Sequence, residues 1–377
     1  MLSVLLSESL YKGDSMHKVI ILGCGNIGFT AAILLQNSKK YDVTIVARTK
    51  KSLLFIKKVA HVKTIQIDLS KKESYKDILK GFDSVISALP FYLNVLVAKK
   101  ALKFGLNYFD FTEDVKTTNA IKKIALNASK NQVFIPQCGL APGFISILAY
   151  SLYKQFDEVY SIKMRVGALP KNPSNKILYN LTWSTDGLIN EYSNECFAIK
   201  DSKLVTIQPL EGLEEFSLDG LEYEAFNTSG GLGTLCETLK NKTKELNYKT
   251  IRYKGHRHLM DFLINDLLLG KKKRRGILKE ILEYAIPTTK QDVVLIFCSV
   301  SGMKNGKLKQ ITDVRKIYNK TINEQNLSSI QITTASGLCA VLDLFVRGNL
   351  KMNGFVKQED INIDDFLNNS FGKEYEV

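Results

Sequence analysis

The feature that most constrains this chain is a glycine pattern near its N-terminus. Gly23–Gly28 reads GCGNIG, a complete G-x-G-x-x-G, between an apolar run at Lys18–Leu22 and an amphipathic stretch at Ile27–Leu35. The first glycine permits a tight turn, the second lets the backbone approach a pyrophosphate, and the third lets the helix pack on the strand. The pattern predicts a dinucleotide site, although the turn could also belong to another α/β domain. The expected cofactor contacts are Gly23, Gly25, Asn26, Ile27 and Gly28.

The first third of the chain alternates apolar runs with helical stretches of about ten residues, which is typical of a doubly wound parallel sheet. Strands are expected at Lys18–Leu22, Asp42–Ala47, Thr64–Leu69, Ser84–Leu89, Tyr108–Thr112 and Val133–Gln137. Helices are expected at Ile27–Leu35, Lys51–Val59, Glu73–Lys80, Asn94–Phe104 and Thr118–Lys130. The fold class is therefore α/β, with a Rossmann domain over residues 16–140.

The rhythm changes after Pro142, where strands with one solvated face indicate a second α+β domain with a mixed or antiparallel sheet. Strands are expected at Val159–Val166, Leu204–Ile207, Lys249–Tyr253, Val293–Ser299 and Leu308–Tyr318. Helices are expected at Ile145–Lys154, Tyr179–Tyr192, Leu232–Thr238, Leu259–Leu268, Ile277–Tyr284 and Thr334–Arg347. We expect residues 141–333 to bind substrate and to dimerise, and residues 334–377 to return to the first domain.

Composition indicates a globular protein with ordinary apolar and charged fractions. The net charge is +14, but its only dense cluster is Lys271–Arg275, without interleaved aromatic side chains, so we expect solvated surface rather than a nucleic-acid footprint. No apolar run reaches the roughly 18 residues of a membrane span. Residues 1–15 lack the basic start of a signal peptide and are expected to be either a non-structural extension or an over-called start before Met16. The six cysteines form no CxxC pair, which is typical of reduced thiols in the cytoplasm.

The end of the second expected strand carries information about the cofactor. NAD-binding domains usually place a carboxylate there, about 20 residues after the glycines, to bind the ribose 2′-hydroxyl. This chain has Arg48 followed by Thr49, and a guanidinium is suited to a 2′-phosphate because it forms paired, charge-assisted hydrogen bonds. We therefore favour NADP over NAD. The alternative is that Arg48 is solvated and NAD binds without a carboxylate clamp.

Six further segments resemble the saccharopine dehydrogenase-like family, which includes saccharopine reductases, lysine 6-dehydrogenases and carboxynorspermidine dehydrogenases. They occur in the family's order and span most of the chain. The matching segments are Val85–Pro90 (VISALP), Cys138–Gly143 (CGLAPG), Gly167–Pro170 (GALP), Trp183–Gly187 (WSTDG), Ala225–Gly231 (AFNTSGG) and Thr250–Gly255 (TIRYKG).

The resemblance implies an oxidoreductase that acts on the CH–NH bond of an amino acid or its secondary amine. It implies that Asp68 lies near the adenine and that Asp110 lies where nicotinamide and substrate meet. It also suggests a homodimer. Further residues implied along the cofactor are Ala88, Leu89 and Pro90, and those implied beside the substrate are Phe91, Phe111 and Thr112.

Two departures concern the substrate. Saccharopine-forming members have an Asp where this chain has Ala141, and an Arg that holds a carboxylate where it has Thr228. Both changes resemble the lysine 6-dehydrogenase branch, but that branch has a His at the position of Asn227.

Hydride transfer requires alignment, a dry pocket and a group that binds the substrate's charge. Arg252 is the best group for an α-carboxylate, unless it forms a structural ion pair. Asn227, Thr228 and Ser229 are expected beside the substrate, where Thr228 and Ser229 could bind the same carboxylate or cap the next helix. Asp110 and His256 are weak catalytic candidates, because His256 could carry a proton or be an ordinary loop histidine. His256 and His258 have no third ligand pattern nearby, so no metal site is expected.

The first functional hypothesis is an NAD(P)-dependent amino-acid dehydrogenase of the saccharopine or lysine type, with a small-molecule amino-acid substrate. The second is a carboxynorspermidine-type reductase of polyamine synthesis. The third is a non-catalytic dinucleotide-binding homologue. The chain has no G-x-S-x-G motif and no P-loop lysine after the glycines, so hydrolase and kinase functions lack their motifs.

Overall fold

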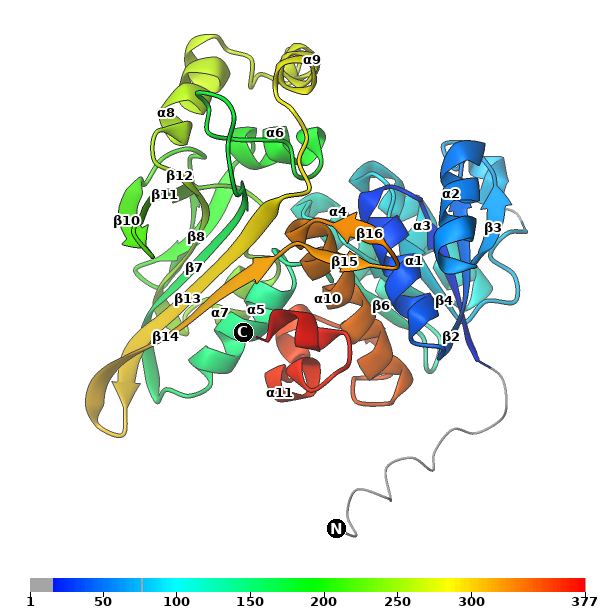
Figure 1. Cartoon of the computed structure of the whole chain (residues 1–377). Helices are drawn as coiled ribbons and strands as arrows, with labels where there is room; N and C mark the ends of the chain where they lie inside the picture. The colour runs from blue at the N-terminus through cyan, green and yellow to red at the C-terminus, as the bar shows by residue number, and fades with distance from the viewer. Residues whose placement is uncertain (1–15, 76, 377) are drawn as a thin grey trace.

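A computed structural model describes residues 16–75 and 77–376, and residues 1–15, with the extension expected there, lie outside the described part. Two β-sheets stand side by side, with α10 (Ser329–Val346) between them (Figure 1). The chain crosses from one sheet to the other after β6 (Val133–Ile135) and returns through α10 and the C-terminal segment.

The first sheet has seven strands in the order β17-β6-β5-β4-β1-β2-β3, and all of its pairings are parallel. The order 3-2-1-4-5-6 is that of the doubly wound dinucleotide-binding fold, which confirms the predicted fold class. Residues Val19–Leu22 have no exposed surface, because β1 lies in the middle with helices on both faces. The strands are β1 (His17–Leu22), β2 (Tyr41–Ala47), β3 (Lys63–Gln66), β4 (Ser84–Ser87), β5 (Asn107–Asp110), β6 (Val133–Ile135) and β17 (Gly354–Phe355).

The helices around this sheet begin and end within a few residues of their predicted bounds. The expected helix at Glu73–Lys80 was wrong: the described part of that segment forms a short 3-10 helix, η1 (Lys72–Tyr75), and then turns. The Tyr75 hydroxyl donates to the Leu69 carbonyl at 2.8 Å, which holds this connection compact. The helices are α1 (Asn26–Asn37), α2 (Lys50–Ala60), α3 (Phe91–Phe104) and α4 (Val115–Ala125).

The second sheet has eight strands and is mixed, as predicted. Its main path is β10-β11-β12-β7-β13-β14, in which only β12 and β7 pair in parallel, and β8 joins β12 and β9 at one side. The strands are β7 (Glu158–Pro170), β8 (Cys196–Lys200), β9 (Lys203–Ile207), β10 (Glu214–Leu218), β11 (Leu221–Asn227), β12 (Thr243–Tyr253), β13 (Asp292–Lys304) and β14 (Lys307–Tyr318). A separate hairpin is formed by β15 (Lys320–Ile322) and β16 (Gln325–Leu327).

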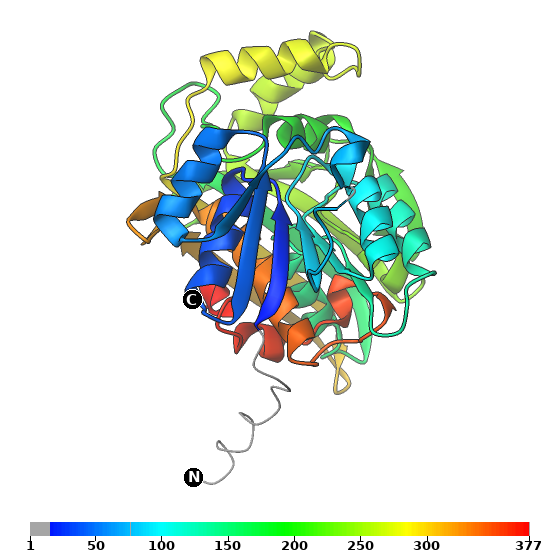
Figure 2. The same cartoon turned by 90° about the vertical axis from the view of Figure 1, so that its right-hand side faces the viewer.

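One helix of this half, α6, begins later than the sequence predicts. The expected helix Tyr179–Tyr192 exists only as α6 (Thr185–Ser193), because Ser184 caps its start by accepting from the Gly187 N–H at 3.2 Å. Figure 2 shows α9 above the sheets, on the side where α6 also lies. The other helices are α5 (Phe144–Tyr153), α7 (Leu235–Leu239), α8 (His256–Asp261), the π-helical turn η2 (Phe262–Asp266), α9 (Arg275–Ala285), α11 (Ile363–Leu367) and the 3-10 turns η3 (Gln358–Asp360) and η4 (Gly372–Tyr375).

Helix α10 connects the two sheets. Ser328 and Gln331 form a capping box at its start, and the Gln331 Nε2 also donates to the Asn26 carbonyl at 3.2 Å, beside the glycine turn. The helix is long and apolar enough to cross a membrane by length and composition, but 83% of it is buried inside the protein, as in a core helix.

A buried carboxylate in α10 joins three parts of the chain. Asp343 accepts hydrogen bonds from the Tyr41 hydroxyl at 2.6 Å and from the Asn369 amide at 2.7 Å, and it pairs with Arg347 at 2.7 Å. It has no exposed surface. Such a carboxylate is stabilising only while its partners remain, because a buried polar group without a partner is costly.

We therefore expect Asp343→Ala to lower the free energy of unfolding by about 2–3 kcal/mol, the cost of lost hydrogen bonds to a charged group. Urea denaturation followed by fluorescence measures the change. Asp365→Asn, an exposed carboxyl in α11, is the control and should shift stability by less than about 0.5 kcal/mol. Equal denaturation midpoints for the two variants would contradict the structural role of Asp343.

Candidate functional site

A cleft of about 940 Å³ lies between the two sheets, and both halves of the chain line it. This volume is in the range of cofactor and substrate pockets. Its Rossmann wall comes from the carboxyl ends of the strands, where doubly wound folds bind their ligands. On the side of the first sheet, the wall is formed by Gly25–Gly28, Ala88–Phe91, Phe111–Glu113, Gly139–Pro142 and, from α10, Gln331. The opposite wall is formed by Thr182–Ser184, Asn190, Glu191, Tyr248, Thr250 and Arg252.

The glycine turn has the shape that a pyrophosphate requires. A Cβ on Gly28 would overlap the Gly23 carbonyl, and a Cβ on Gly23 would come within 2.5 Å of the Ala88 carbonyl, so this turn packs tightly on the strand ends. Gly25, by contrast, would place a Cβ in open space, and it precedes the first N–H groups of α1. An anion can therefore approach the backbone at Gly25 and the helix N-terminus, and the residues present fit a dinucleotide.

Arg48 and Thr49 lie at the end of β2 and are exposed, outside the lining of the cleft. Among the described residues, the Arg48 guanidinium has no ion-pair or hydrogen-bond partner, and only its backbone carbonyl accepts from Gln66. The Asp68 carboxylate lies close enough to interact electrostatically with the Arg48 guanidinium. Hydrogen bonds from Ser70, with a smaller contribution from Arg48, lower the pKa of Asp68. Arg48 is thus an unpaired cation beside the expected adenosine position.

Asp110 organises the strand ends from beneath the cleft rather than lining it. It is fully buried and accepts from the Tyr108 hydroxyl at 2.6 Å, the Asn94 amide at 3.2 Å and the backbone N–H groups of Thr112 and Gln137 at 2.9 Å each. Burial raises its pKa to about 6, although these hydrogen bonds oppose the shift. The carboxylate therefore fixes the loops that carry Phe111 and Thr112 into the cleft.

The opposite wall of the cleft contains a buried guanidinium. The Arg252 Nε donates to the Tyr192 hydroxyl at 2.7 Å, and Nη1 donates to the Ile251 carbonyl at 2.8 Å. The guanidinium also lies over the rings of Tyr179 and Tyr192, at 5.1 and 5.7 Å. Its Nη2 is 4.0 Å from the Glu191 carboxylate, which is an ion-pair distance but too long for a hydrogen bond. Nη2 is therefore available for a bound carboxylate.

His256 supports this arrangement from behind. Its Nδ1 contacts the Ile177 carbonyl at 2.8 Å, so Nδ1 carries the proton and Nε2 accepts from the Tyr192 hydroxyl at 3.0 Å. Burial and the nearby Arg252 lower the pKa of His256 to about 3, so the ring is neutral. The ring has no exposed surface and does not line the cleft. The geometry gives His256 a positioning role, since it orients Tyr192, which orients Arg252.

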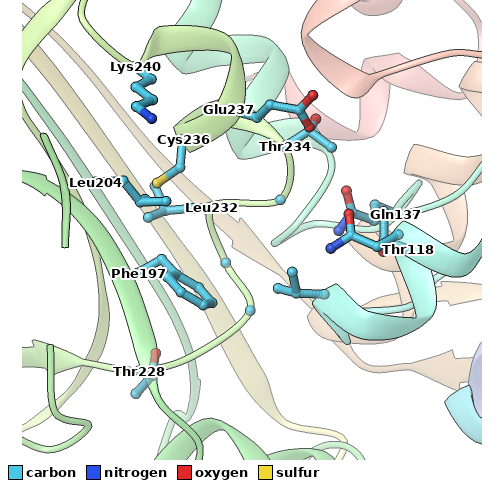
Figure 3. Close-up of a pocket in the computed structure, with 15 residues that line it drawn as sticks. Thr118, Gln137, Phe197, Leu204, Thr228, Leu232, Thr234, Cys236, Glu237 and Lys240 are labelled. Carbon is cyan, nitrogen blue, oxygen red and sulfur yellow. The ribbon is translucent and has the colours of Figure 1, made fainter. Parts of the chain in front are cut away.

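The TSGG segment does not face the cleft in the way expected. Asn227 donates to the Gln208 carbonyl at 3.3 Å, and Ser229 donates to the Asn190 carbonyl at 3.1 Å. Thr228 shares a hydrogen bond of 2.8 Å with Thr250 and lines a second cavity of about 380 Å³. Figure 3 shows Thr228 at this second cavity. Of the predicted substrate residues, the structure therefore brings Phe91, Phe111, Thr112 and Arg252 into the cleft together.

Several cleft residues were not singled out from the sequence. Glu113 and Glu191 both line the cleft, and burial raises the pKa of both carboxyls. Lys272 and Arg275, from the basic cluster, also line it, and Arg275 donates to the side chains of Asn190 and Asn194 at 3.0 and 2.9 Å. The WSTDG motif was a usable signal, because it begins the helix that carries Glu191. Among the described residues, no group of three potential metal ligands occurs.

Comparison with known proteins agrees with this geometry. Residues 19–135 match the saccharopine dehydrogenase NADP binding domain, and residues 139–374 match the saccharopine dehydrogenase C-terminal domain. The chain belongs to the saccharopine dehydrogenase family. The resemblance predicted from its motifs is thus confirmed.

Individual relatives are distant. The chain is 22% identical over 206 residues to saccharopine dehydrogenase [NADP(+), L-glutamate-forming] of Schizosaccharomyces pombe, which covers 53% of this chain and 45% of that protein. It is 23% identical over 322 residues to the mitochondrial alpha-aminoadipic semialdehyde synthase of Rattus norvegicus, covering 79% of this chain and 33% of that protein. The chain therefore spans less than half of either relative.

A solved structure shares the fold along most of the chain. Apo saccharopine dehydrogenase (L-Glu forming) from Saccharomyces cerevisiae superposes with a TM-score of 0.76 at 16% identity, covering 93% of this chain and 95% of that one. The similarity confirms the predicted combination of a parallel Rossmann sheet with a second, mixed sheet.

The neutral His256 has a measurable consequence for stability. Its pKa is about 3 in the folded protein against an ordinary value of 6.5, so between these values the unfolded chain binds a proton that the folded protein does not. Stability from this group is therefore present above about pH 6.5 and is lost as the pH falls. At about pH 5 the loss is about 2 kcal/mol.

We expect the stability difference between wild type and His256→Gln to narrow by this amount from neutral pH to about pH 5, as measured by urea unfolding. The comparison cancels carboxyl groups that titrate in both proteins. His258→Gln, which replaces an exposed histidine two positions further along the chain, is the matched control. A difference for His256→Gln that is independent of pH would contradict a neutral, buried ring.

Proposed function

We propose that this protein is an NADP-dependent oxidoreductase that acts on the CH–NH bond of an amino acid or its secondary amine. The observation that carries the proposal is a single cleft with a pyrophosphate-shaped glycine turn on one wall and the buried Arg252 guanidinium on the other. The names of the similar proteins support a reaction of the saccharopine type. Neither a polyamine reductase nor a non-catalytic homologue is favoured by those names.

The cofactor would bind along the first sheet. Gly23, Gly25, Asn26, Ile27 and Gly28 would hold the pyrophosphate at the start of α1, as their packing and open space permit. Arg48 and Thr49 would contact the 2′-phosphate, with Asp68 near the adenine. Ala88, Leu89 and Pro90 would lie along the nicotinamide end. When bound, the nicotinamide supplies the acceptor or donor of the hydride.

The substrate would lie across the cleft from the cofactor. Arg252 would bind a carboxylate through its free Nη2, since Tyr192 and the Ile251 carbonyl already occupy its other side. Phe91, Phe111 and Thr112 would form the apolar and polar floor near the reacting carbon. Because Thr228 lines the second cavity, Arg252 is the main anchor that we propose.

We further propose that residues 16–140 with 334–377 form the cofactor-binding unit and that residues 141–333 form the substrate-binding unit of a cytoplasmic homodimer. All six cysteines are free thiols, which supports a reducing compartment. The placement of Lys272 and Arg275 at the cleft supports a role for part of the basic cluster in binding anionic small molecules rather than nucleic acid.

A panel of turnover assays tests the function. We expect NADPH oxidation with aminoadipate semialdehyde plus an amine donor, or NADP reduction with saccharopine or lysine. Putrescine or diaminopropane with aspartate semialdehyde tests the polyamine alternative. Gly28→Val, in which the added side chain overlaps the Gly23 carbonyl, is the control for contaminating enzymes and should show no turnover. Silence of the folded, cofactor-binding wild type across the panel would overturn the proposal.

Cofactor choice is tested by reversing the charge at Arg48. Arg48→Asp should weaken NADPH binding by about 1.5–3 kcal/mol, or about tenfold or more, because charged hydrogen bonds to the 2′-phosphate are lost. NADH binding should not weaken. Lys57→Asp, at the far end of α2, makes the same change in net charge and should leave the preference unchanged. An unaltered preference in Arg48→Asp, measured by fluorescence titration, would refute the NADP assignment.

A further inference from the structure

One carboxyl of the cleft, that of Glu191, accepts no hydrogen bond from the described part of the protein. The Glu191 side chain is 12% exposed and lines the cleft, where its nearest cation, Arg252 Nη2, is 4.0 Å away. Among the residues that the structure describes, none donates a hydrogen bond to this carboxyl. Buried carboxylates normally accept several hydrogen bonds, so the free oxygens of Glu191 are positioned for a ligand.

The backbone that carries Glu191 is fixed from two sides. The Glu191 carbonyl accepts from the Ser229 N–H at 3.0 Å, and the preceding residue, Asn190, is held by Ser229 and by Arg275 at 3.1 and 3.0 Å. The end of α6 is therefore tied to the loop after β11 and to α9. A side chain on such a rigid support can hold its carboxyl at a constant place in the cleft.

We propose that Glu191 is the group that accepts the proton of the substrate amine during oxidation and returns it during reduction. The inference rests on the proposed function. An amine at neutral pH is an ammonium ion, and its nitrogen cannot form a C=N bond until one N–H bond has broken. That proton would pass to a Glu191 oxygen, forming an O–H bond and leaving a neutral amine with its lone pair.

The remaining steps are the loss of hydride from carbon in oxidation and the return of the proton in reduction. The lone pair would then form the C=N bond as hydride leaves the adjacent carbon, and the iminium product would carry the positive charge that the ammonium had. A bound oxidised nicotinamide would supply the hydride acceptor. In reduction, hydride adds to the iminium carbon and the amine takes its proton back from Glu191. Arg252, 4.0 Å away, would bind the substrate carboxylate and so place the amine beside Glu191.

The environment of Glu191 suits proton exchange near physiological pH. Burial raises its pKa to about 8; the charge of Arg252 opposes this shift and that of Glu113 adds to it. A proton acceptor is most effective when its pKa lies near the working pH. An incoming ammonium stabilises the carboxylate, so binding itself prepares the acceptor. The titratable or charged groups that interact with Glu191 are Arg252 and Tyr248 on β12, Glu113 after β5, Tyr179, Tyr192 and Cys196.

Two measurements test the proposal, and the first needs no turnover. Infrared titration of the NADP-loaded protein should show a protonated carboxyl that is present at neutral pH and lost near pH 8, and that is missing in Glu191→Gln. Glu195→Gln, an exposed carboxyl four positions along the chain, is the matched control and should retain the signal. A wild-type spectrum without this carboxyl would overturn the proposal and leave Glu191 as a counterion of Arg252.

The second measurement is the pH profile of kcat/KM for amine oxidation with the substrate found in the panel. In wild type the rate should rise through about pH 8, where Glu191 ionises. Glu191→Gln should lose this limb and most of kcat, and added formate should restore part of the rate in Glu191→Ala. If Glu191→Gln changes KM but keeps kcat and the pH limb, Glu191 only pairs with Arg252 and the proposal is wrong.

The two proposals fail in different ways. Silence of wild type across the panel overturns the oxidoreductase function and the catalytic role of Glu191 together, while the infrared titration still reports whether Glu191 holds a proton. Turnover that persists unchanged in Glu191→Gln overturns the role of Glu191 alone.

Discussion

The burial of one positive charge determines how the second half of the cleft is built. Arg252 is 2% exposed, and removing a guanidinium from water is costly unless hydrogen bonds and nearby negative charge replace the lost hydration. Tyr192 supplies an acceptor for Nε, His256 orients Tyr192, and the tyrosine rings cover the face of the guanidinium. Each of these groups in turn needs its own partner, which explains why His256 must be neutral and must donate to the Ile177 carbonyl. This wall of the cleft is therefore the outer end of a buried series of hydrogen bonds that runs through His256 and Tyr192 to Arg252.

The first sheet buries an acidic group instead, because the Asp110 carboxyl lies under the cleft. Asp110 accepts four hydrogen bonds and so ties the end of β5 to α3 and to the segment after β6. Glu191 differs from it in a way that separates structure from chemistry. Asp110 is satisfied by the fold, and its environment leaves no oxygen for a ligand, whereas Glu191 is held only by its backbone. Two carboxyls with raised pKa values can therefore have unrelated roles, and the pattern of hydrogen bonds tells them apart.

The sequence was sufficient for the Rossmann half and for the family. Strands such as β1 are apolar on both faces, and the glycine turn fixes the order strand, turn and helix, so local patterns are decisive there. The second half was harder to predict from the sequence because its edge strands are short and polar. Strand β10, for example, reads EEFSL and was not predicted. The helices at Glu73–Lys80 and Tyr179–Tyr192 were predicted too long for a different reason, because helical composition does not reveal where tertiary contacts end a helix. The predicted site contacts remain predictions.

The residues that the sequence could not supply are those whose importance comes from burial. Glu191 is one carboxyl among 38 acidic residues, and nothing near it in the sequence marks it as different. Only the fold brings it within 4.0 Å of Arg252, 61 positions away, and removes the water that would keep its pKa ordinary. The fold also decides the position of Thr228, which the TSGG pattern associates with a ligand but which the Thr250 hydroxyl holds at the wall of the second cavity. A motif locates a segment, whereas the direction of each side chain depends on contacts between distant strands. In this cleft, those contacts place the Arg252 guanidinium and the Glu191 carboxyl 4.0 Å apart on the wall opposite the glycine turn, and two opposite charges side by side are what the carboxylate and ammonium of an amino acid would require.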